Sequence, residues 1–340
     1  MEILTTYTGS FPLPHNAENV RRVLRDVSEI GIDWPNYPQL INFIDMFLAP
    51  IAKSGGLEVK GGRFVLSGEL KMPSIDDAVQ PILESLEAWR EEGRGMGLRA
   101  CVTGPFTLSS FIFKRPGTTN IMESALGDRE VVHFLAKYIN SVLRRLEELG
   151  INYVNVDEPI IGTMVGARRN LFNYSDDEIK EVVDEAYRGV GVGLRGIHVC
   201  GRLNPKVFNI LGRIEKVNIL DNEYMDSPEN VNYITRDVVG DKRLAIGVVS
   251  SRNPAIESVD SIVQLAGKII DRVGRDRVFA VKPDCGFGSL RTESGDIEEA
   301  YKVSLEKLKA LRTAANLINE LVSSRLKRLG AGPALEGKHQ

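Results

Sequence analysis

Apolar residues in this chain alternate, almost from end to end, between short runs rich in β-formers and longer stretches with helical periodicity. This alternation is typical of a parallel sheet whose strands are joined by crossover helices. The runs that we assign to strands are Ile3–Thr8, Arg63–Gly68, Leu98–Val102, Asn152–Val156, Gly193–Val199, Lys216–Leu220, Leu244–Val249 and Arg277–Lys282. Eight β/α units in 340 residues predict an α/β fold, a single (β/α)8 TIM barrel.

Two helical stretches carry clear local signals. Ser175-Asp176-Asp177-Glu178 is a capping box, in which the first hydroxyl and the last carboxylate satisfy backbone N–H groups at a helix start. An apolar stripe at helical spacing predicts a helix packed on the outside of the barrel: Ile297, Ala300, Tyr301, Leu305, Leu308 and Leu311.

The chain shows no linker rich in Pro, Gly or Ser and no repeat beyond the β/α rhythm. We therefore expect one catalytic barrel over residues 1–329, followed by a flexible tail over residues 330–340. The segment around Asn36-Tyr37-Pro38 separates the first two predicted strands and is longer than a usual βα loop. It predicts an insertion after the first strand that serves as a lid or as a surface for a partner.

Composition narrows the class of protein. With 43% hydrophobic and 26% charged residues, the chain is expected to fold and to be soluble. A net charge of −3 offers no basic excess for nucleic acid or an anionic membrane. The N-terminus lacks a signal peptide, and no apolar run is long enough to span a bilayer. Three scattered cysteines do not make a disulfide framework, so we expect a cytoplasmic protein.

Unusual polar residues follow the predicted strands, at the end where TIM-barrel active sites are built. They are Ser10, Glu69, Thr103, Asp157, Glu158, His198, Cys200, Glu223, Ser250 and Cys285. This coincidence predicts that the chemistry of the protein lies at the carboxyl ends of the strands.

A metal site is the most specific prediction from these residues. His198 and Cys200 are two apart on an extended segment, so their side chains leave the same side and can converge on one ion. Taken alone, this pair is equally consistent with a buried His and Cys in the core. Glu223 and Cys285, at the ends of two other strands, complete the donors that tetrahedral Zn²⁺ prefers.

Such a site would suit thiol chemistry. Two thiolates and a carboxylate place three negative charges around a divalent ion, which makes it a modest Lewis acid. The ion can still bind an incoming thiol as the thiolate and leave its sulfur nucleophilic. We expect Glu223 to be the ligand that loosens when the substrate sulfur arrives.

A second set of residues predicts binding of an amino acid. Glu69 and Asp157 would bind a cationic group such as an α-ammonium, although one acid of the Asp157-Glu158 pair could instead cap a helix or lie in solvent. The Thr8-Gly9-Ser10 turn would supply N–H groups and a hydroxyl for a carboxylate. The remaining cysteine and histidines are given no functional role, with the cysteine interpreted as a core residue: Cys101, His15, His133 and His339.

These residues resemble the C-terminal catalytic barrel of the cobalamin-independent methionine synthases, in a short archaeal-type form. The resemblance extends over nearly the whole chain. It is carried by Thr8-Gly9-Ser10-Phe11-Pro12, Gly68-Glu69, Thr103-Gly104-Pro105, Asp157-Glu158-Pro159, His198-Val199-Cys200, Glu223 and Pro283-Asp284-Cys285-Gly286.

The resemblance implies an enzyme that activates homocysteine as a thiolate and methylates it to methionine. Glu69 and Asp157 would hold the amino group of homocysteine, and Thr8 to Ser10 its carboxylate. The zinc ligands implied by motif match are His198, Cys200, Glu223 and Cys285.

Several positions depart from the family pattern. The long members carry an additional N-terminal barrel, whereas this chain begins at the catalytic one. Phe111 stands where the family has a folate-contacting Trp, Thr163 where it has a Glu, and Arg252 where it has a proton-donating His. No catalytic residue is then assigned beyond the metal site.

The missing acid bears on the methyl donor. A methyl group on a pterin nitrogen is a poor electrophile until that nitrogen is protonated, whereas a methyl group on a corrinoid cobalt needs no such acid. We therefore expect a methyl-corrinoid protein or a non-standard pterin, which would dock at the barrel mouth on the segment Asp33–Pro38.

Two alternatives stay open. The first is zinc-dependent alkyl transfer to another thiol such as coenzyme M, although its sulfonate favours cationic partners over Glu69 and Asp157. The second is a non-catalytic barrel, because four candidate ligands could also form a closed structural zinc site.

Overall fold

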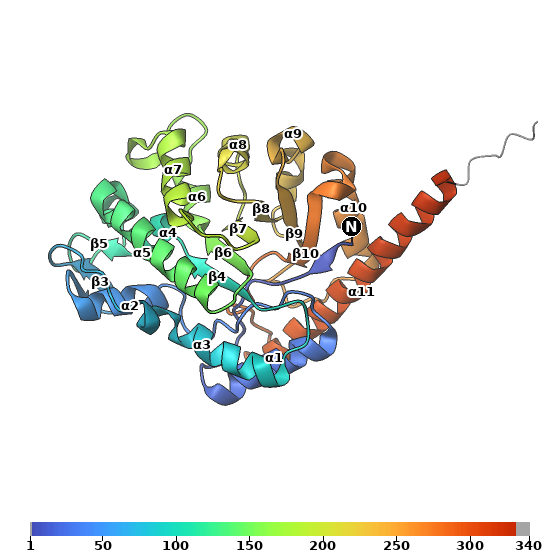
Figure 1. The fold of residues 1–340 in the computed structure, drawn as a ribbon, viewed down its shortest axis with the longest axis horizontal. Coiled ribbons are helices and arrows are strands. Elements are labelled where there is room, and N and C mark those ends of the chain that lie inside the picture. Colours follow the sequence, from blue (N-terminus) through green and yellow to red (C-terminus); the bar gives the residue numbers. More distant parts are fainter. Residues whose placement is uncertain (1, 331–340) are drawn as a thin grey trace, which may run out of the picture.

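A curled parallel sheet forms the centre of the structure, a computed structural model that describes residues 2–330 (Figure 1). Its strands are β1 (Leu4–Thr5), β4 (Arg99–Thr103), β6 (Tyr153–Asp157), β7 (Leu194–Val199), β8 (Ile219–Glu223), β9 (Arg243–Val249) and β10 (Val278–Pro283). They lie in the order β1-β10-β9-β8-β7-β6-β4, with every neighbouring pair parallel. The predicted TIM-barrel fold is confirmed.

A segment without regular strand structure closes the barrel between β1 and β4. Parallel bridges join Thr6 to Trp34 and Asn36 to Arg99. The Arg99 N–H donates to the Pro35 carbonyl (2.8 Å), and an N–H of residue 37 donates to the Arg99 carbonyl (3.0 Å). Residues 34–37 therefore occupy the second position in the barrel wall, which the sequence analysis assigned to a strand at residues 63–68.

The prediction of a lid or partner surface at Asp33–Pro38 is wrong. Asn36 and Tyr37 are 0% exposed, because they form part of the barrel wall. Two prolines obscured this from the pattern, since proline lacks an N–H and argues against an internal strand.

The predicted strand at residues 63–68 lies outside the barrel. It forms β3 (Arg63–Leu66), which pairs antiparallel with β2 (Leu57–Lys60) and parallel with β5 (Ile112–Phe113). The sequence analysis placed an insertion after the first strand; in the structure the inserted elements, α2 (Asp45–Ser54) and the β2–β3 hairpin, instead follow residues 34–37, the second segment of the barrel wall. Glu69, which follows β3, is consequently not at the end of a barrel strand.

Helices surround the sheet (Figure 1). The remaining α-helices are α1 (Ala17–Ile30), α3 (Ile75–Glu92), α4 (Pro105–Ser110), α5 (Arg129–Glu148), α6 (Pro159–Met164), α7 (Asp176–Ala186), α8 (Pro205–Arg213), α9 (Arg236–Val239), α10 (Val259–Val273) and α11 (Ile297–Gly330). Short 3₁₀ turns occur at Ile121–Glu123, Ala125–Gly127, Leu171–Asn173, Pro228–Asn232 and Arg275–Arg277. Within residues 2–330, no helix is long and apolar enough to cross a membrane.

Both helical signals in the sequence are confirmed. The Ser175 hydroxyl accepts from the Glu178 N–H (3.0 Å), and the Glu178 carboxylate accepts from the Ser175 N–H (2.7 Å) at the start of α7. The stripe on α11 is buried at Tyr301, Leu308 and other positions, whereas Ile297 at its start is 44% exposed. Of the tail predicted over residues 330–340, residues 331–340 lie outside the described part of the chain.

Candidate metal centre and substrate pocket

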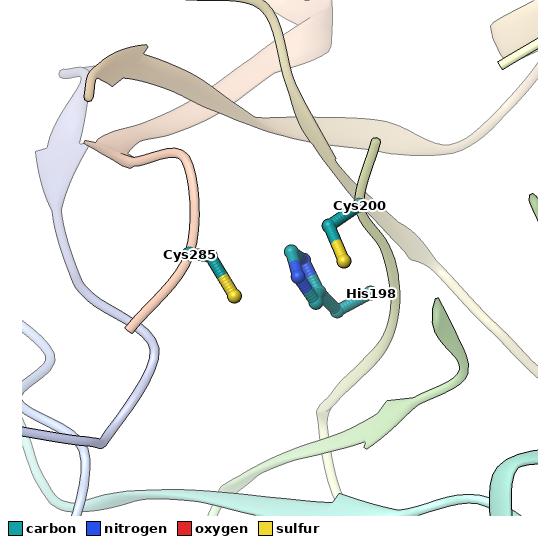
Figure 2. Close-up of side chains that lie close together, drawn as sticks. All are labelled: His198, Cys200 and Cys285. Atoms are coloured by element: carbon teal, nitrogen blue, oxygen red, sulfur yellow. The ribbon is translucent and has the colours of Figure 1, made fainter. Parts of the chain in front are cut away.

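Three of the four predicted metal ligands come together at the mouth of the barrel. His198 lies near the end of β7, Cys200 directly follows β7, and Cys285 lies in the turn after β10. One donor atom from each lies within 4.8 Å of the other two. Figure 2 shows the two sulfur atoms and the imidazole ring approaching one another from two separate segments. The cluster can hold a metal ion.

The imidazole of His198 is oriented by a buried carboxylate. Its Nδ1 lies 2.7 Å from Asp221 Oδ1, and the two residues are register partners on β7 and β8. Nε2 is buried without a hydrogen bond in good geometry among the described residues, and the Cys285 thiol interacts with the same ring, so this atom is available to a metal ion. A carboxylate behind a ligand histidine fixes both its tautomer and its direction.

Burial opposes a charge on His198, but Asp221 outweighs it and raises the pKa of the imidazole to about 10. A metal ion that binds Nε2 must therefore displace a proton.

The two thiols share a hydrogen bond, and their pKa values shift in opposite directions. A hydrogen bond from Cys200 outweighs burial and, with help from His198, holds the pKa of the Cys285 thiol well below its usual range. The same hydrogen bond, together with burial, raises the pKa of Cys200. Cys285 is thus the first thiolate, and Cys200 gives up its proton only when a cation arrives.

Glu223, the fourth predicted ligand, lies at the end of β8 and is 0% exposed. One carboxylate oxygen accepts from the Ser227 hydroxyl (2.5 Å). The other accepts no hydrogen bond from the described residues, and it lies 3.5 Å from Arg252 Nη2. Glu223 is not one of the three residues of the cluster, and its role as a ligand stays a prediction.

The donor set fits a zinc ion. Imidazole and thiolates are the ligands that Zn²⁺ favours, and hard cations such as Mg²⁺ and Ca²⁺ favour oxygen. Nε2 of His198 and Oε2 of Glu223 are both buried without a hydrogen bond that meets ordinary geometry to a described residue, so a bound cation would contact them; Oε2 also faces the exposed Arg252.

A cavity of about 790 Å³ opens from the cluster toward solvent. Its polar lining includes Thr8, Ser10, Asp157, His198, Cys200 and Cys285. Its apolar lining includes Phe11, Leu13, Leu40, Ile41, Phe43 and Ile297. The metal cluster and most of the predicted amino-acid clamp therefore share one pocket.

The amino-terminal turn is pressed against the turn that carries Cys285. The Ser10 carbonyl accepts from the Phe287 N–H (2.7 Å), and its hydroxyl accepts from the Gly288 N–H (3.1 Å). A Cβ at Gly286 would collide with the Ser10 hydroxyl, so only glycine fits there. The Thr8 hydroxyl is buried without a partner among the described residues, and it borders the pocket.

The two acids after β6 have different environments. Asp157 is partly buried at the pocket, accepts from Asn155 Nδ2 (2.7 Å), and has its pKa raised by burial to about 6. Glu158 accepts from the Phe106 N–H (2.9 Å) and from the N–H and hydroxyl of Thr107 (2.8 and 2.7 Å). Glu158 is therefore the capping acid, at the start of α4, and Asp157 is the acid available to a ligand.

Glu69 does not join these residues. It is exposed in the loop after β3, and it is not among the described residues that line the pocket. Its role in substrate binding stays a prediction. Phe111 and Thr163, two of the departures from the family pattern, are also exposed, whereas Arg252 lies beside the buried Glu223.

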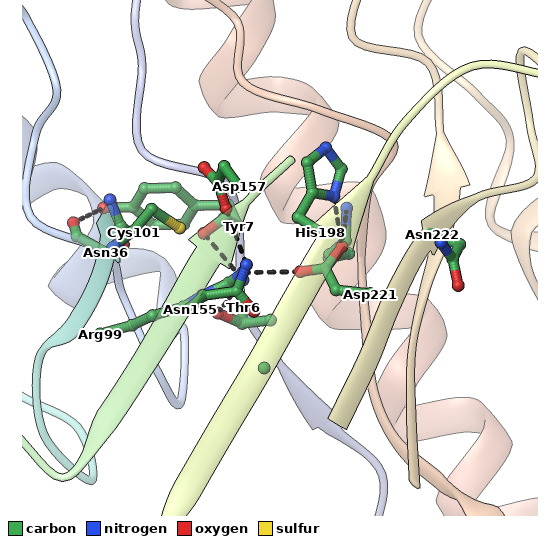
Figure 3. A network of polar contacts seen from close by, with 12 residues as sticks. Thr6, Tyr7, Asn36, Arg99, Cys101, Asn155, Asp157, His198, Asp221 and Asn222 are labelled. Carbon is green, nitrogen blue, oxygen red and sulfur yellow. Dashed lines mark hydrogen bonds and ion pairs between the residues drawn. The ribbon is translucent and has the colours of Figure 1, made fainter. Parts of the chain in front are cut away.

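A buried charge network below His198 was missed by the sequence analysis (Figure 3). Asp221 lies 2.6 Å from Arg99 Nη2 and 2.9 Å from Lys282 Nζ, and all three side chains are 0% exposed. Burial would raise the pKa of Asp221, but Lys282, His198 and Arg99 hold it well below its usual range. Charged residues inside two predicted strands, at positions 99 and 282, were the available signal.

Comparisons with known proteins identify the family. The family described as "Cobalamin-independent synthase, Catalytic domain" matches residues 92–312. A methionine synthase of Sulfolobus acidocaldarius is 24% identical over 89% of this chain and 88% of its own length. A methionine synthase of Pyrococcus horikoshii is 28% identical over 91% of this chain and 82% of its own length.

Solved structures share the fold. A B12-independent methionine synthase from Shewanella sp. W3-18-1, in complex with selenomethionine, has a TM-score of 0.73 at 15% identity, covering 95% of this chain and 100% of that one. A methyltransferase from Methanosarcina mazei has a TM-score of 0.63 at 16% identity, covering 93% of each chain. The resemblance inferred from the motifs is confirmed. Because the family match covers more than half of its residues, the chain belongs to the cobalamin-independent synthases and contains their catalytic domain.

Proposed function

We propose that the protein methylates homocysteine to give methionine. The observation that carries the proposal is the single pocket in which the His198, Cys200 and Cys285 cluster lies with Asp157 and Thr8. In such a pocket the metal cluster can bind the sulfur of a substrate, and the polar groups can bind the ammonium and carboxylate of an amino acid. The relatives found in Sulfolobus acidocaldarius and Pyrococcus horikoshii are methionine synthases, which supports the same activity.

His198, Cys200 and Cys285 would hold a zinc ion, with Glu223 as the displaceable fourth ligand. When bound, the ion would supply a Lewis acid that lowers the pKa of the substrate thiol into the neutral range.

The remaining groups position the amino acid. Asp157 would accept the α-ammonium, because a carboxylate whose pKa is about 6 is ionised above neutral pH. The Thr8 hydroxyl, without a partner among the described residues, would donate to the α-carboxylate. A clamp on both backbone groups directs the side-chain sulfur toward the metal cluster.

The reaction transfers a methyl group to sulfur. The thiol loses its proton, and the sulfur attacks the methyl carbon to form the new S–C bond. The bond between the methyl group and the donor breaks, and its electron pair leaves with the donor. A guanidinium stays protonated throughout, so Arg252 is no acid for this leaving group.

We therefore infer a donor whose leaving group needs no protonation, such as a methyl-corrinoid, ahead of a non-standard pterin. The cavity of about 790 Å³ is larger than an amino acid requires, and its outer wall is apolar. The donor would enter past the exposed Phe43 and Ile297, because residues 33–38 are part of the barrel wall.

The test uses the purified zinc-loaded protein with homocysteine and either methylcobalamin or methyltetrahydrofolate, and methionine is measured by mass spectrometry. We expect methionine with methylcobalamin. Turnover only with the folate would overturn the donor assignment, and no methionine with either donor would count against the activity itself.

One observation favours a second function. Arg291 also lines the pocket and offers a cation for a sulfonate, as in alkyl transfer to coenzyme M. D157A separates the two, because it should raise the KM for homocysteine and leave the use of coenzyme M unchanged. D237A, at an exposed acid on α9, is the matched control.

A further inference from the structure

Lys282 makes an unusual set of contacts for a buried lysine. It lies on β10 and is 0% exposed. Its ammonium donates to the carbonyls of Pro283 (2.7 Å) and Asp284 (2.8 Å), and it lies 2.9 Å from Asp221 Oδ1. An ammonium has three N–H donors, and each has an acceptor here.

These acceptors belong to two different parts of the metal cluster. The two carbonyls belong to the two residues immediately before Cys285, at the end of β10 and the start of the turn. The carboxylate oxygen on β8 that contacts Lys282 is the same atom that lies 2.7 Å from His198 Nδ1. One ammonium therefore joins the backbone that presents Cys285 to the carboxylate that orients His198.

The charges of this network also favour a role toward the cluster. Arg99 contacts the second oxygen of Asp221 at 2.6 Å (Figure 3). Among the described contacts, this one carboxylate therefore serves two buried cations, Arg99 and Lys282, in addition to the His198 imidazole. A buried charge without a full counter-charge is costly to the fold, so the excess of positive charge here calls for a role beyond stability. The additional positive charge lies below a cluster that contains two thiols, and it offsets their negative charge when both are ionised.

We propose that Lys282 is a positioning residue that couples the two arms of the metal site, by locking the Cys285 turn to His198 through Asp221. The inference rests on the proposed metal site. Lys282 does not touch the substrate, because it is not one of the described residues that line the pocket. Its effect is on the geometry and affinity of the ligands.

The test compares K282M with K307M in the full-length zinc-loaded protein. Lys307 is a matched control, because it is also 0% exposed and its ammonium contacts a carbonyl (Ala255, 2.5 Å) and a carboxylate (Glu257, 2.8 Å). Zinc affinity is measured by competition with a chromophoric chelator, and thermal stability is measured alongside. We expect K282M to weaken zinc binding about 10- to 100-fold and K307M to change it less than about twofold.

A double-mutant cycle tests the route of the effect. D221N keeps an oxygen that can accept from His198 and removes the charge that Lys282 contacts. If Lys282 acts through Asp221, the loss of zinc affinity in K282M/D221N should be smaller than the product of the two single losses. If K282M does not fold, K282R and ¹⁵N NMR of the His198 ring in D221N carry the test: the amide removes the charge that raises the pKa of the imidazole, so that pKa should fall.

Equal zinc affinities for K282M and K307M, multiplicative losses in the cycle, or an unchanged His198 ring in D221N would each overturn the inference. These readouts are independent of methyl transfer. A protein that behaves as expected in zinc binding but makes no methionine would refute the proposed function and leave the coupling intact.

Discussion

Glu158 is expected to make the stability of the barrel depend on pH. Its carboxylate is 0% exposed and accepts three hydrogen bonds at the start of α4. Burial nevertheless dominates and raises the pKa of Glu158 from 4.5 to about 7. The folded protein therefore holds the Glu158 proton more tightly than the unfolded chain does.

The sign and size follow from proton linkage. Below pH 4.5 Glu158 is protonated in both states, and its contribution to the free energy of unfolding is fully present. That contribution is lost as pH rises toward 7, because the unfolded chain ionises freely and the folded protein must bury a charge. At roughly 1.4 kcal/mol for each tenfold change, the loss is about 3 kcal/mol.

The perturbation is E158Q, a neutral side chain of the same shape. Chemical unfolding at pH 5 and pH 8 gives the free energy of unfolding of both proteins, and the comparison removes contributions from other acids. Wild type should lose about 2.5 kcal/mol more than E158Q between pH 5 and pH 8, because the unfolded chain is already partly ionised at pH 5. E158Q should still be less stable than the protonated wild type, because its amide places a donor against backbone N–H groups. Equal pH dependence in the two proteins would refute the reasoning.

Three further outcomes are expected. D157A should raise the KM for homocysteine about 10- to 100-fold at unchanged zinc content, whereas D237A should not; steady-state kinetics and metal analysis check this. G286A should weaken zinc binding and lower stability by about 1–3 kcal/mol, because its methyl group has to displace Ser10; a G267A control, with open space around its Cβ, should not. Removal of zinc by a chelator should lower Tm in wild type, and added zinc should restore it, whereas C200A/C285A should show no shift in calorimetry.

Much of the fold could be predicted because periodicity and strand propensity are local properties. Runs such as Asn152–Val156 and Leu244–Val249 are apolar and bounded by turn residues, and each became a barrel strand. The second position of the barrel wall was missed because residues 34–37 join the barrel through only two isolated bridges, at Trp34 and Asn36, in a segment that is interrupted by prolines. Its place is set by neighbours that the local pattern does not contain.

Some residues of the candidate site could likewise be predicted from the local sequence, and others could not. The cluster of His198, Cys200 and Cys285 could be predicted because few residue types bind zinc and each lies at or just past the end of a strand that was correctly assigned. Glu69 follows a strand of the small sheet, so the strand-end argument did not apply to it. Asp221 was missed because the predicted strand ended at Leu220, one residue short of the acid that orients the histidine.

The closure of the barrel also determines how the substrate and metal sites relate. Gly9 packs so close to residues 34–37 that a Cβ would collide with Asn36, and Gly286 packs in the same way against Ser10. The turn at residues 8–10 is thus held between the barrel wall and the turn that carries Cys285. Because neither contact leaves room for adjustment, a shift of one turn must shift the other. Changes at Gly286 should therefore alter zinc affinity and the KM for homocysteine together, whereas changes at Asp157 should alter only the KM.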